Sequence, residues 1–486
     1  MKRIPLLFSL ALLAGCSVGP DYHKPAAVTA VPPGWKEAQP ADRLPRGPWW
    51  ELYHDAELTR LEQQAQGQNQ DLRAAVARVD QARAVARLEG ASFFPQLTLD
   101  AQAQRQRLTE NNPTFQQFQL PNTKIPSATV NSRSVPIDLS YEIDVWGRVR
   151  RSFESSQAQA QASVADLQNI LLTLQSDVAV DYLTLREYDR ELAILRATVD
   201  TRKKSLEINQ KRLQAGRATA LDVEQAKTEL ANSEASLAQV EESRAHMQDA
   251  LAYLCGEPAS SFALAENPLP VDALPPAIPA GIPSDVLERR PDVAAAERTL
   301  KARNAQIGVA TAAYFPTISL TGNYGYLSYS ADNLFTHPSS VWAIGPSVSL
   351  PLFTGGKTAA QVRQAKSQYE EAVAQYRGVV LGAFRDVEDA LASTRTLAKQ
   401  AEATGRAAKS ASHARELSEQ RYKAGAVDYF EVTEEQRLEL SAQRAEAQVA
   451  GQRLYASVRL VKALGGGWDS SVLKGEKPGP NPVDAP

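Results

Sequence analysis

The sequence predicts an α+β chain in which four long antiparallel helices and four β-strands form two repeats. Residues 148–216 contain no proline and a single glycine at their end, and their apolar side chains recur every three or four residues. That is the period of one helix face. Other stretches alternate apolar and polar residues, which is the period of a strand. Both patterns occur a second time in the same order, so we interpret the chain as two copies of one unit.

The helical pattern predicts two pairs of long helices, over about 148–214 and 219–255 and again over about 357–424 and 428–464. At about 1.5 Å per residue, the longer helix of each pair is about 100 Å long. No single globular core is that wide, so each helix must pack along partners of similar length. Heptad-like spacing supports side-by-side coiled-coil packing of the second helix, with Val223, Leu230, Leu237 and Leu251 on one face.

The alternating pattern predicts two β-hairpins, over about 94–146 and about 315–353. In residues 135–145 every odd position is apolar, and every even position is polar or proline. The other three strands alternate similarly, so each has one apolar and one polar face. Residues 108–130 are rich in asparagine and proline and predict the loop of the first hairpin.

Matching residues in the two halves support the duplication. The matched residues are Asp71 and Asp292, Phe94 and Phe315, and Pro95 and Pro316. The predicted order is a first repeat over 49–255, a proline-rich linker over 256–283, a second repeat over 284–464 and a mobile tail over 465–486.

The N-terminus predicts a lipoprotein signal. Two cations and a short apolar run precede Leu13-Ala14-Gly15-Cys16, which is the order of a secretory signal with small residues at its cleavage site. Residues 1–15 are then removed, Cys16 carries S-diacylglycerol and an N-acyl chain, and residues 16–48 form a tether. The residue after the cysteine is Ser17 rather than an aspartate, which resembles the bacterial lipoproteins that are sent on to the outer membrane. The alternative is an ordinary signal with an incidental cysteine.

Composition excludes several classes of function. The net charge of −3 is too close to neutral for a nucleic-acid binder. The five histidines are scattered without the spacing of a metal site. No acid, base or nucleophile motif indicates catalysis. The sequence therefore predicts no enzyme, no metal and no cofactor apart from covalent lipid.

Strands of about ten residues with one apolar face fit a transmembrane β-barrel. Four strands do not close a barrel, and an open sheet edge is not tolerated in lipid. The chain is therefore expected to oligomerise so that several copies share one barrel. The alternative is a soluble sandwich whose apolar face covers a core.

The combined motifs resemble the TolC family of outer-membrane factors, and most closely its lipoprotein branch of the OprM and NodT type. The residues that carry the resemblance are the cysteine motif followed by Val18-Gly19-Pro20-Asp21-Tyr22, the duplicated unit, and the Ala-Gly turns at 215–216 and 424–425. The resemblance implies a homotrimer in which a twelve-stranded barrel continues into a periplasmic helical barrel. It also implies a periplasmic adaptor (membrane fusion) protein and an inner-membrane transporter of the RND type as partners.

The helical tips, with their turn glycines Gly216 and Gly425, are the candidate functional site. The resemblance places the acidic residues of these tips at a constricted periplasmic entrance, where a trimer turns each into a ring of three carboxylates; the candidates are Asp222, Asp428, Glu431 and Glu434. The acidic residues of TolC at two of these positions are aspartates, which leaves the size of the constriction in doubt.

Helix capping is the competing interpretation of these acids. Thr219-x-x-Asp222 and Asp428-x-x-Glu431 have the form of an N-cap followed by an acid at N3. Capping alone can explain Asp222, and at Asp428 it can coexist with a gate. For Glu431 and Glu434 the alternative is a solvated helix face.

The predicted function is a passive outer-membrane exit duct for drugs or other small toxic compounds in a Gram-negative bacterium. A duct for type I protein secretion or for siderophores is a close variant. A structural coiled-coil lipoprotein is the alternative class, and it leaves the strands unexplained. The sequence does not name the cargo.

Overall fold

The computed structural model describes residues 17–26, 34–36, 47–110, 127–270, 272–279 and 289–468. The predicted signal peptide, Cys16 and most of the predicted tail lie outside the described residues. The chain divides into two compact units. The first comprises Met1–Lys24, Gln81–Ala160 and Arg298–Val373, and the second comprises Pro25–Asp80, Gln161–Glu297 and Ala374–Pro486.

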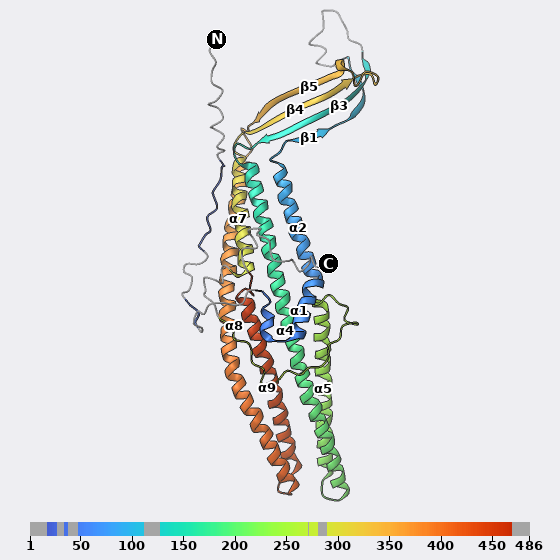
Figure 1. Ribbon diagram of the computed structural model, residues 1–486, viewed down its shortest axis with the longest axis vertical. Coiled ribbons are helices and arrows are strands. Elements are labelled where there is room, and N and C mark those ends of the chain that lie inside the picture. Colours follow the sequence, from blue (N-terminus) through green and yellow to red (C-terminus); the bar gives the residue numbers. More distant parts are fainter. Residues whose placement is uncertain are drawn as a thin grey trace, which may run out of the picture. The chain divides into compact units, whose positions relative to one another are not determined.

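The predicted fold class is confirmed, with four long helices and two sets of strands (Figure 1). The helices are η1 (Trp49–Tyr53), α1 (Ala56–Gln68), α2 (Gln70–Ala91), α4 (Arg148–Gln214), α5 (Ala220–Leu254), α7 (Pro291–Ala312), η2 (His337–Ser339), α8 (Lys357–Lys423) and α9 (Tyr429–Ala463). The strands are β1 (Gln96–Leu99), β2 (Gln102–Leu108), β3 (Ala128–Ile143), β4 (Thr317–Ser328) and β5 (Ser340–Ser349).

The first unit contains one antiparallel sheet in the order β1–β3–β4–β5, and β2 also pairs with β3. Strands β1 and β2 share one register on β3, because Leu99 pairs with Ile137 and Gln102 pairs with Ser134. The strand predicted here as continuous is interrupted between them, opposite Pro136. A proline has no N–H to donate, so the ladder loses a bond at that point.

The strands of the first hairpin extend further toward its loop than predicted. Strand β2 runs to Leu108 and β3 begins at Ala128, inside the stretch expected to be loop. Residues Arg105, Gln106 and Arg107 pair with 129–131, and they carry no apolar alternation. Periodicity therefore gave no signal for this extension.

The two faces of the sheet differ in polarity. Register places Leu99, Ile137, Tyr324 and Trp342 in one row across the strands. The neighbouring row on the opposite face contains Thr98, Asp138, Asn323 and Ala343. Leu99 is 67% exposed and Trp342 is 72% exposed. A single chain thus leaves a contiguous apolar face uncovered, which marks a surface made for lipid or a partner.

The N-terminal segment 17–26 is tied to the helical part of the first unit. The N–H of Val18 donates to the carbonyl of Trp146 at 3.0 Å, and Arg151 pairs with Asp21 at 2.7 Å. Gly147 has a φ of +80°, and a Cβ there would lie 2.7 Å from the hydroxyl of Ser17. Only glycine therefore permits this close approach at the junction between β3 and α4.

The second unit holds α5, α9 and most of α4 and α8, whose beginnings, up to Ala160 and Val373, belong to the first unit. Both α4 and α8 contain 67 residues, and both α5 and α9 contain 35. No helix in the described part of the chain is long and apolar enough to cross a membrane.

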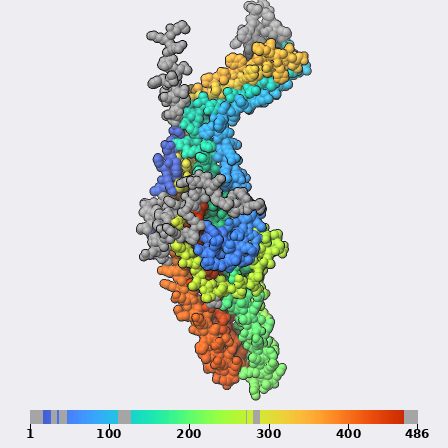
Figure 2. All heavy atoms as spheres, in the orientation of Figure 1, coloured from blue at the N-terminus to red at the C-terminus, as the bar shows by residue number. Residues whose placement is uncertain are grey.

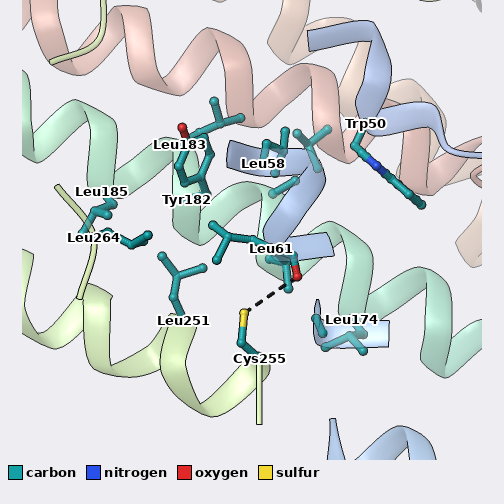
Figure 3. Packing of buried hydrophobic residues seen from close by; sticks show 14 of the residues in the cluster. Trp50, Leu58, Leu61, Leu174, Tyr182, Leu183, Leu185, Leu251, Cys255 and Leu264 are labelled. Atoms are coloured by element: carbon teal, nitrogen blue, oxygen red, sulfur yellow. Dashed lines mark hydrogen bonds between the residues drawn. The ribbon is translucent and has the colours of Figure 1, made fainter. Parts of the chain in front are cut away.

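The main core of the second unit lies where η1 and α1 pack against α4, α5 and α9 (Figure 3). Cys255 is buried in it, and its thiol donates weakly to the carbonyl of Leu61 at 3.8 Å. Burial raises the pKa of the Cys255 thiol to about 12, as expected of an inert structural cysteine. Asp55 caps α1 and accepts a hydrogen bond from Tyr182 of α4 at 2.9 Å, which fixes α1 on α4.

We predict that Leu61→Ala lowers the free energy of unfolding by about 2–5 kcal/mol, because it leaves a cavity in this core. Leu61 is fully buried. Leu221→Ala is the matched control, since Leu221 is exposed on α5. Unfolding followed by circular dichroism in detergent measures both changes. Equal stability of the two variants would contradict the assigned core.

Candidate functional site at the helical tips

Each helical pair turns at a glycine in the left-handed region. Gly216 has a φ of +67° and Gly425 a φ of +74°. Beyond α4 the N–H of Arg217 donates to the carbonyl of Arg212, and beyond α8 the N–H of Ala426 donates to that of Arg421. These bonds satisfy helix-end carbonyls, and the conformation explains why glycine stands at both turns.

The predicted capping box at the start of α5 is confirmed. The hydroxyl of Thr219 accepts from the N–H of Asp222 at 3.2 Å, and the carboxylate of Asp222 accepts from the N–H of Thr219 at 2.7 Å. At the start of α9, Asp428 accepts from the N–H of Glu431 at 3.2 Å. The carboxylates of Asp222 and Asp428 therefore both accept capping hydrogen bonds at the start of their own helices.

Glu431 and Glu434 each lie beside an arginine. Arg421 of α8 contacts Glu431 at 2.8 Å, and Arg437 contacts Glu434 at 2.8 Å. Both glutamates are partly exposed. The structure thus places two ion pairs at the tip of α8–α9, at the two carboxylates that the sequence assigned either to a constricted entrance or to a solvated helix face.

A buried carboxylate joins three helices above the tips. Glu229 of α5 pairs with Arg202 of α4 at 2.8 Å and accepts from the Nε of Arg437 of α9 at 2.8 Å. Both Glu229 and Arg202 are almost fully buried. Burial, the largest cause, lowers the pKa of Arg202 from its ordinary value, and the nearby Glu229 carboxylate opposes this shift.

Tyr422 forms a second contact between the helical pairs α4–α5 and α8–α9. The hydroxyl of Tyr422 on α8 donates to Oδ1 of Asn209 on α4 at 2.8 Å, and the guanidinium of Arg212 lies 4.3 Å from the Tyr422 ring centre. Tyr429 packs against Tyr422 with ring centres 5.7 Å apart.

We call the set Asn209, Arg212, Tyr422, Glu229, Arg202 and Arg437 the tip latch. Its contacts run from α4 to α8 and from α5 to α9. Figure 2 shows the tips of the two pairs, green and orange-red, lying side by side. The latch therefore sets how far apart the two pairs stand at their ends.

Sequence reasoning found the turns and caps but missed the tip latch. One sign of the latch was nevertheless present in the sequence of α5. Glu229 falls in the buried row of α5 that contains Val223, Ala226 and Ser233, and a carboxylate in an apolar row requires a cation. The described residues contain no group of three or more side chains suited to hold a metal ion.

The chain matches known proteins along most of its length. The model of the outer membrane efflux protein family matches residues 61–257 and 282–466. The pyoverdine export outer membrane protein OpmQ of Pseudomonas aeruginosa is 34% identical over 473 residues, which cover 97% of this chain and 98% of that protein. The toluene efflux pump outer membrane protein TtgI of Pseudomonas putida is 34% identical over 479 residues, which cover 97% and 99%.

A solved structure is similar as well. The structure of the outer-membrane channel OprN matches with a TM-score of 0.84 at 30% identity, covering 93% of this chain and all of that chain.

Proposed function

This chain belongs to the outer membrane efflux protein family, and we propose that three copies of it form an exit duct whose inner end is closed by the tip latch. The protein is an outer-membrane efflux component. The observation that carries the proposal is the latch, because its bonds hold together two helical pairs that have no covalent link at their tips.

The open edges of the sheet support assembly. Strands β1 and β2 form one edge and β5 the other, so a lone chain leaves unpaired backbone groups that hydrocarbon does not solvate. Three copies give a barrel wide enough for a water-filled channel. The apolar row of Leu99 and Trp342 then faces lipid, and the polar row of Thr98 and Asp138 faces the lumen.

Partners complete the proposal. We assign the chain no catalytic role, so the energy for export comes from an inner-membrane transporter of the RND type, linked through a periplasmic adaptor protein. TtgI is named as the outer-membrane protein of a toluene efflux pump, and this supports the same kind of assembly here. OpmQ is named for pyoverdine export, so similar chains serve different cargo. Small toxic compounds are our proposed cargo, and a siderophore or protein duct is the alternative.

A lipid anchor at Cys16 is the proposed attachment. Ser17, the next residue, lies against Gly147 where β3 gives way to α4. The residue after Cys16 therefore packs beside the sheet that we assign to the bilayer, which supports a lipid anchor on Cys16.

We predict that deletion of the gene makes cells more sensitive to a subset of antibiotics, dyes, detergents and organic solvents. Growth inhibition across such a panel measures the change, and the wild-type gene restores resistance. The Cys16→Ala form restores it only partly, because the lipid is lost. Unchanged sensitivity together with loss of a product from the culture supernatant would instead identify the secretion alternative.

Loosening the tip latch is predicted to open the duct. Glu229→Gln leaves Arg202 buried without its counter-ion, a change that typically costs about 3–5 kcal/mol. Tyr422→Phe removes one hydrogen bond, which contributes about 1 kcal/mol. Conductance in planar bilayers should therefore rise in both variants, and more in Glu229→Gln.

Tyr253→Phe is the control for this experiment. The Tyr253 hydroxyl donates to Asp71 at 2.9 Å on an exposed part of α5, away from the latch. Its conductance should equal that of the wild type. If the Glu229→Gln variant conducts as the wild type does, the tip latch has no part in gating.

The carboxylates Glu431 and Glu434 are proposed to attract cations at the entrance. Replacing both by alanine removes two rings of charge, so we predict a lower cation preference in reversal-potential measurements. Conductance should rise less than in Glu229→Gln, because Arg437 keeps its partner Glu229. Glu241→Ala with Glu242→Ala is the matched control, since both are exposed on α5. If selectivity does not change, these two residues do not line the entrance.

A further inference from the structure

The end of the sheet farthest along the strands from α4 carries three arginines that have no role in the duct as described. Side chains alternate between the two faces of a strand, so the register assigns each strand residue to one face. Leu99 and Ile137 mark the apolar face. The same face carries Arg105 and Arg107 of β2 and Arg133 of β3. We call these three residues the arginine cluster.

The charged residues of the sheet are separated by face. Within strands β1 to β5 and the two residues that join β1 to β2, the apolar face carries the arginine cluster and no acid. The opposite face carries no cation, and its acids are Asp100, Asp138 and Glu142. Water solvates a charge equally well on either face of a sheet. The separation therefore indicates that the two faces meet different surroundings, and that those of the apolar face favour a cation.

The cluster begins at the far boundary of the apolar band. Ile143 is the last residue of β3 before α4, and Arg133 stands ten residues earlier. Ten residues extend about 34 Å along a strand, which gives a height of about 26 Å at a tilt of about 40°, against an apolar band of about 25 Å in membrane barrels. Tyr326 pairs with Val135 just inside Arg133, where interfacial aromatic residues are expected. The arginines thus stand at the level of lipid headgroups.

The three arginines lie close to one another. Arg105 pairs with Asn131 of β3, so Arg105 and Arg133 are diagonal neighbours across the two strands. Such neighbours are about 7–8 Å apart. Arg107 follows Arg105 on the same face of β2. Like charges at this spacing repel one another, so the cluster calls for an anion.

The hydrogen bonds of the cluster do not neutralise it. Arg133 donates to the carbonyl of Tyr329 at 3.3 Å, and Arg107 donates to the hydroxyl of Ser127 at 3.1 Å. Both acceptors are uncharged. Among the described residues, none of the three arginines forms an ion pair.

Two acids belong to the same end of the sheet but lie outside the strands. Glu110 follows β2 and accepts from the N–H of Ser127 at 3.5 Å, which places it near Arg107. Asp332 lies in the connection between β4 and β5. Residues 111–126 add no acid to this end. With Glu110 counted against Arg107, the charges of Arg105 and Arg133 remain without a paired carboxylate.

We propose that the arginine cluster binds the phosphate groups of an anionic lipid in the outer leaflet. Guanidinium groups bind phosphoryl oxygens in bidentate geometry, and basic clusters at headgroup level attract anionic lipids. The diagonal spacing of Arg105 and Arg133 allows both guanidinium groups to contact one phosphate. The inference rests on the proposed function only in taking this face of the sheet to meet lipid.

The position of β2 adds a consequence for assembly. Strands β1 and β2 form one edge of the sheet, which in the proposed barrel pairs with β5 of the next copy. The cluster therefore lies beside the seam between two copies. A lipid bound there covers the seam, and we expect it to raise the temperature at which the trimer dissociates.

Native mass spectrometry of the intact protein, purified as trimers in detergent, tests the site. The probes are diphosphoryl lipid A and zwitterionic phosphatidylethanolamine. We expect lipid A to bind the wild type more tightly than phosphatidylethanolamine does. Its affinity should fall at least about tenfold in the variant that combines Arg105→Gln, Arg107→Gln and Arg133→Gln. Lysine at the same three positions should retain most of the binding, because ammonium groups also bind phosphate.

The variant that combines Arg73→Gln, Arg78→Gln and Arg87→Gln is the matched control, because it removes the same charge from exposed positions on α2. It should bind lipid A as the wild type does. Equal affinity in the wild type and the cluster variant would overturn the proposal, and so would equal affinity for the two lipids. Displacement of lipid A by inorganic phosphate at the same phosphate concentration would assign the cluster to the free ion and overturn the lipid assignment.

Conductance in planar bilayers separates this site from the duct. The glutamine variant of the cluster should conduct as the wild type does, because its substitutions leave the tip latch and the polar face of the sheet unchanged. Conducting trimers that show no preference for lipid A would overturn the lipid site and leave the duct intact. Absence of both trimers and conductance in the wild type would overturn the duct instead.

Discussion

A carboxylate that is buried among helices needs cations or N–H donors close by, and Glu229 obtains them from α4 and α9 at once. Arg202 is equally buried, so neither charge can be left alone without a large cost. The ends of α4, α5 and α9 are therefore fixed relative to one another. Tyr422 and Asn209 add α8 to the same set. Because these contacts lie in a few turns next to the tips, a change of a few kcal/mol there would alter the width of the entrance in the duct that we propose.

The sheet imposes a different constraint. Its apolar row is exposed in the single chain and both of its edges are open. A closed barrel built from several chains in lipid covers the apolar row and pairs both edges. Closure at the sheet in turn places copies of the helical pairs around one axis. Three latches would then surround a single passage, which is the arrangement that the proposed duct requires.

Much of this architecture was predictable from the sequence because it is set by local rules. The apolar period defined the four long helices, and Thr219 and Asp428 marked the starts of α5 and α9 through their caps. The alternation in residues 135–145 gave the two faces of the sheet. The interruption opposite Pro136 was not predictable, because it depends on which residue of one strand faces the proline of another.

The tip latch was not predictable for a similar reason, because it too depends on partners that lie far apart in the sequence. Tyr422 and Asn209 are separated by 213 positions in the sequence, and neither stands out in its own helix. Glu229 does stand out, since it occupies a buried row, but its partners were not evident until the helices were assembled.

The distance between the two tips tests the central claim most directly. Spin labels at Arg217 and Ala426, one in each exposed turn, report this distance by double electron–electron resonance in trimers that contain few labelled chains. The account predicts a narrow distribution in the otherwise wild-type protein and a longer, broader one in Glu229→Gln. A distribution that is broad in both, or that does not change, would contradict a latch that holds the pairs together.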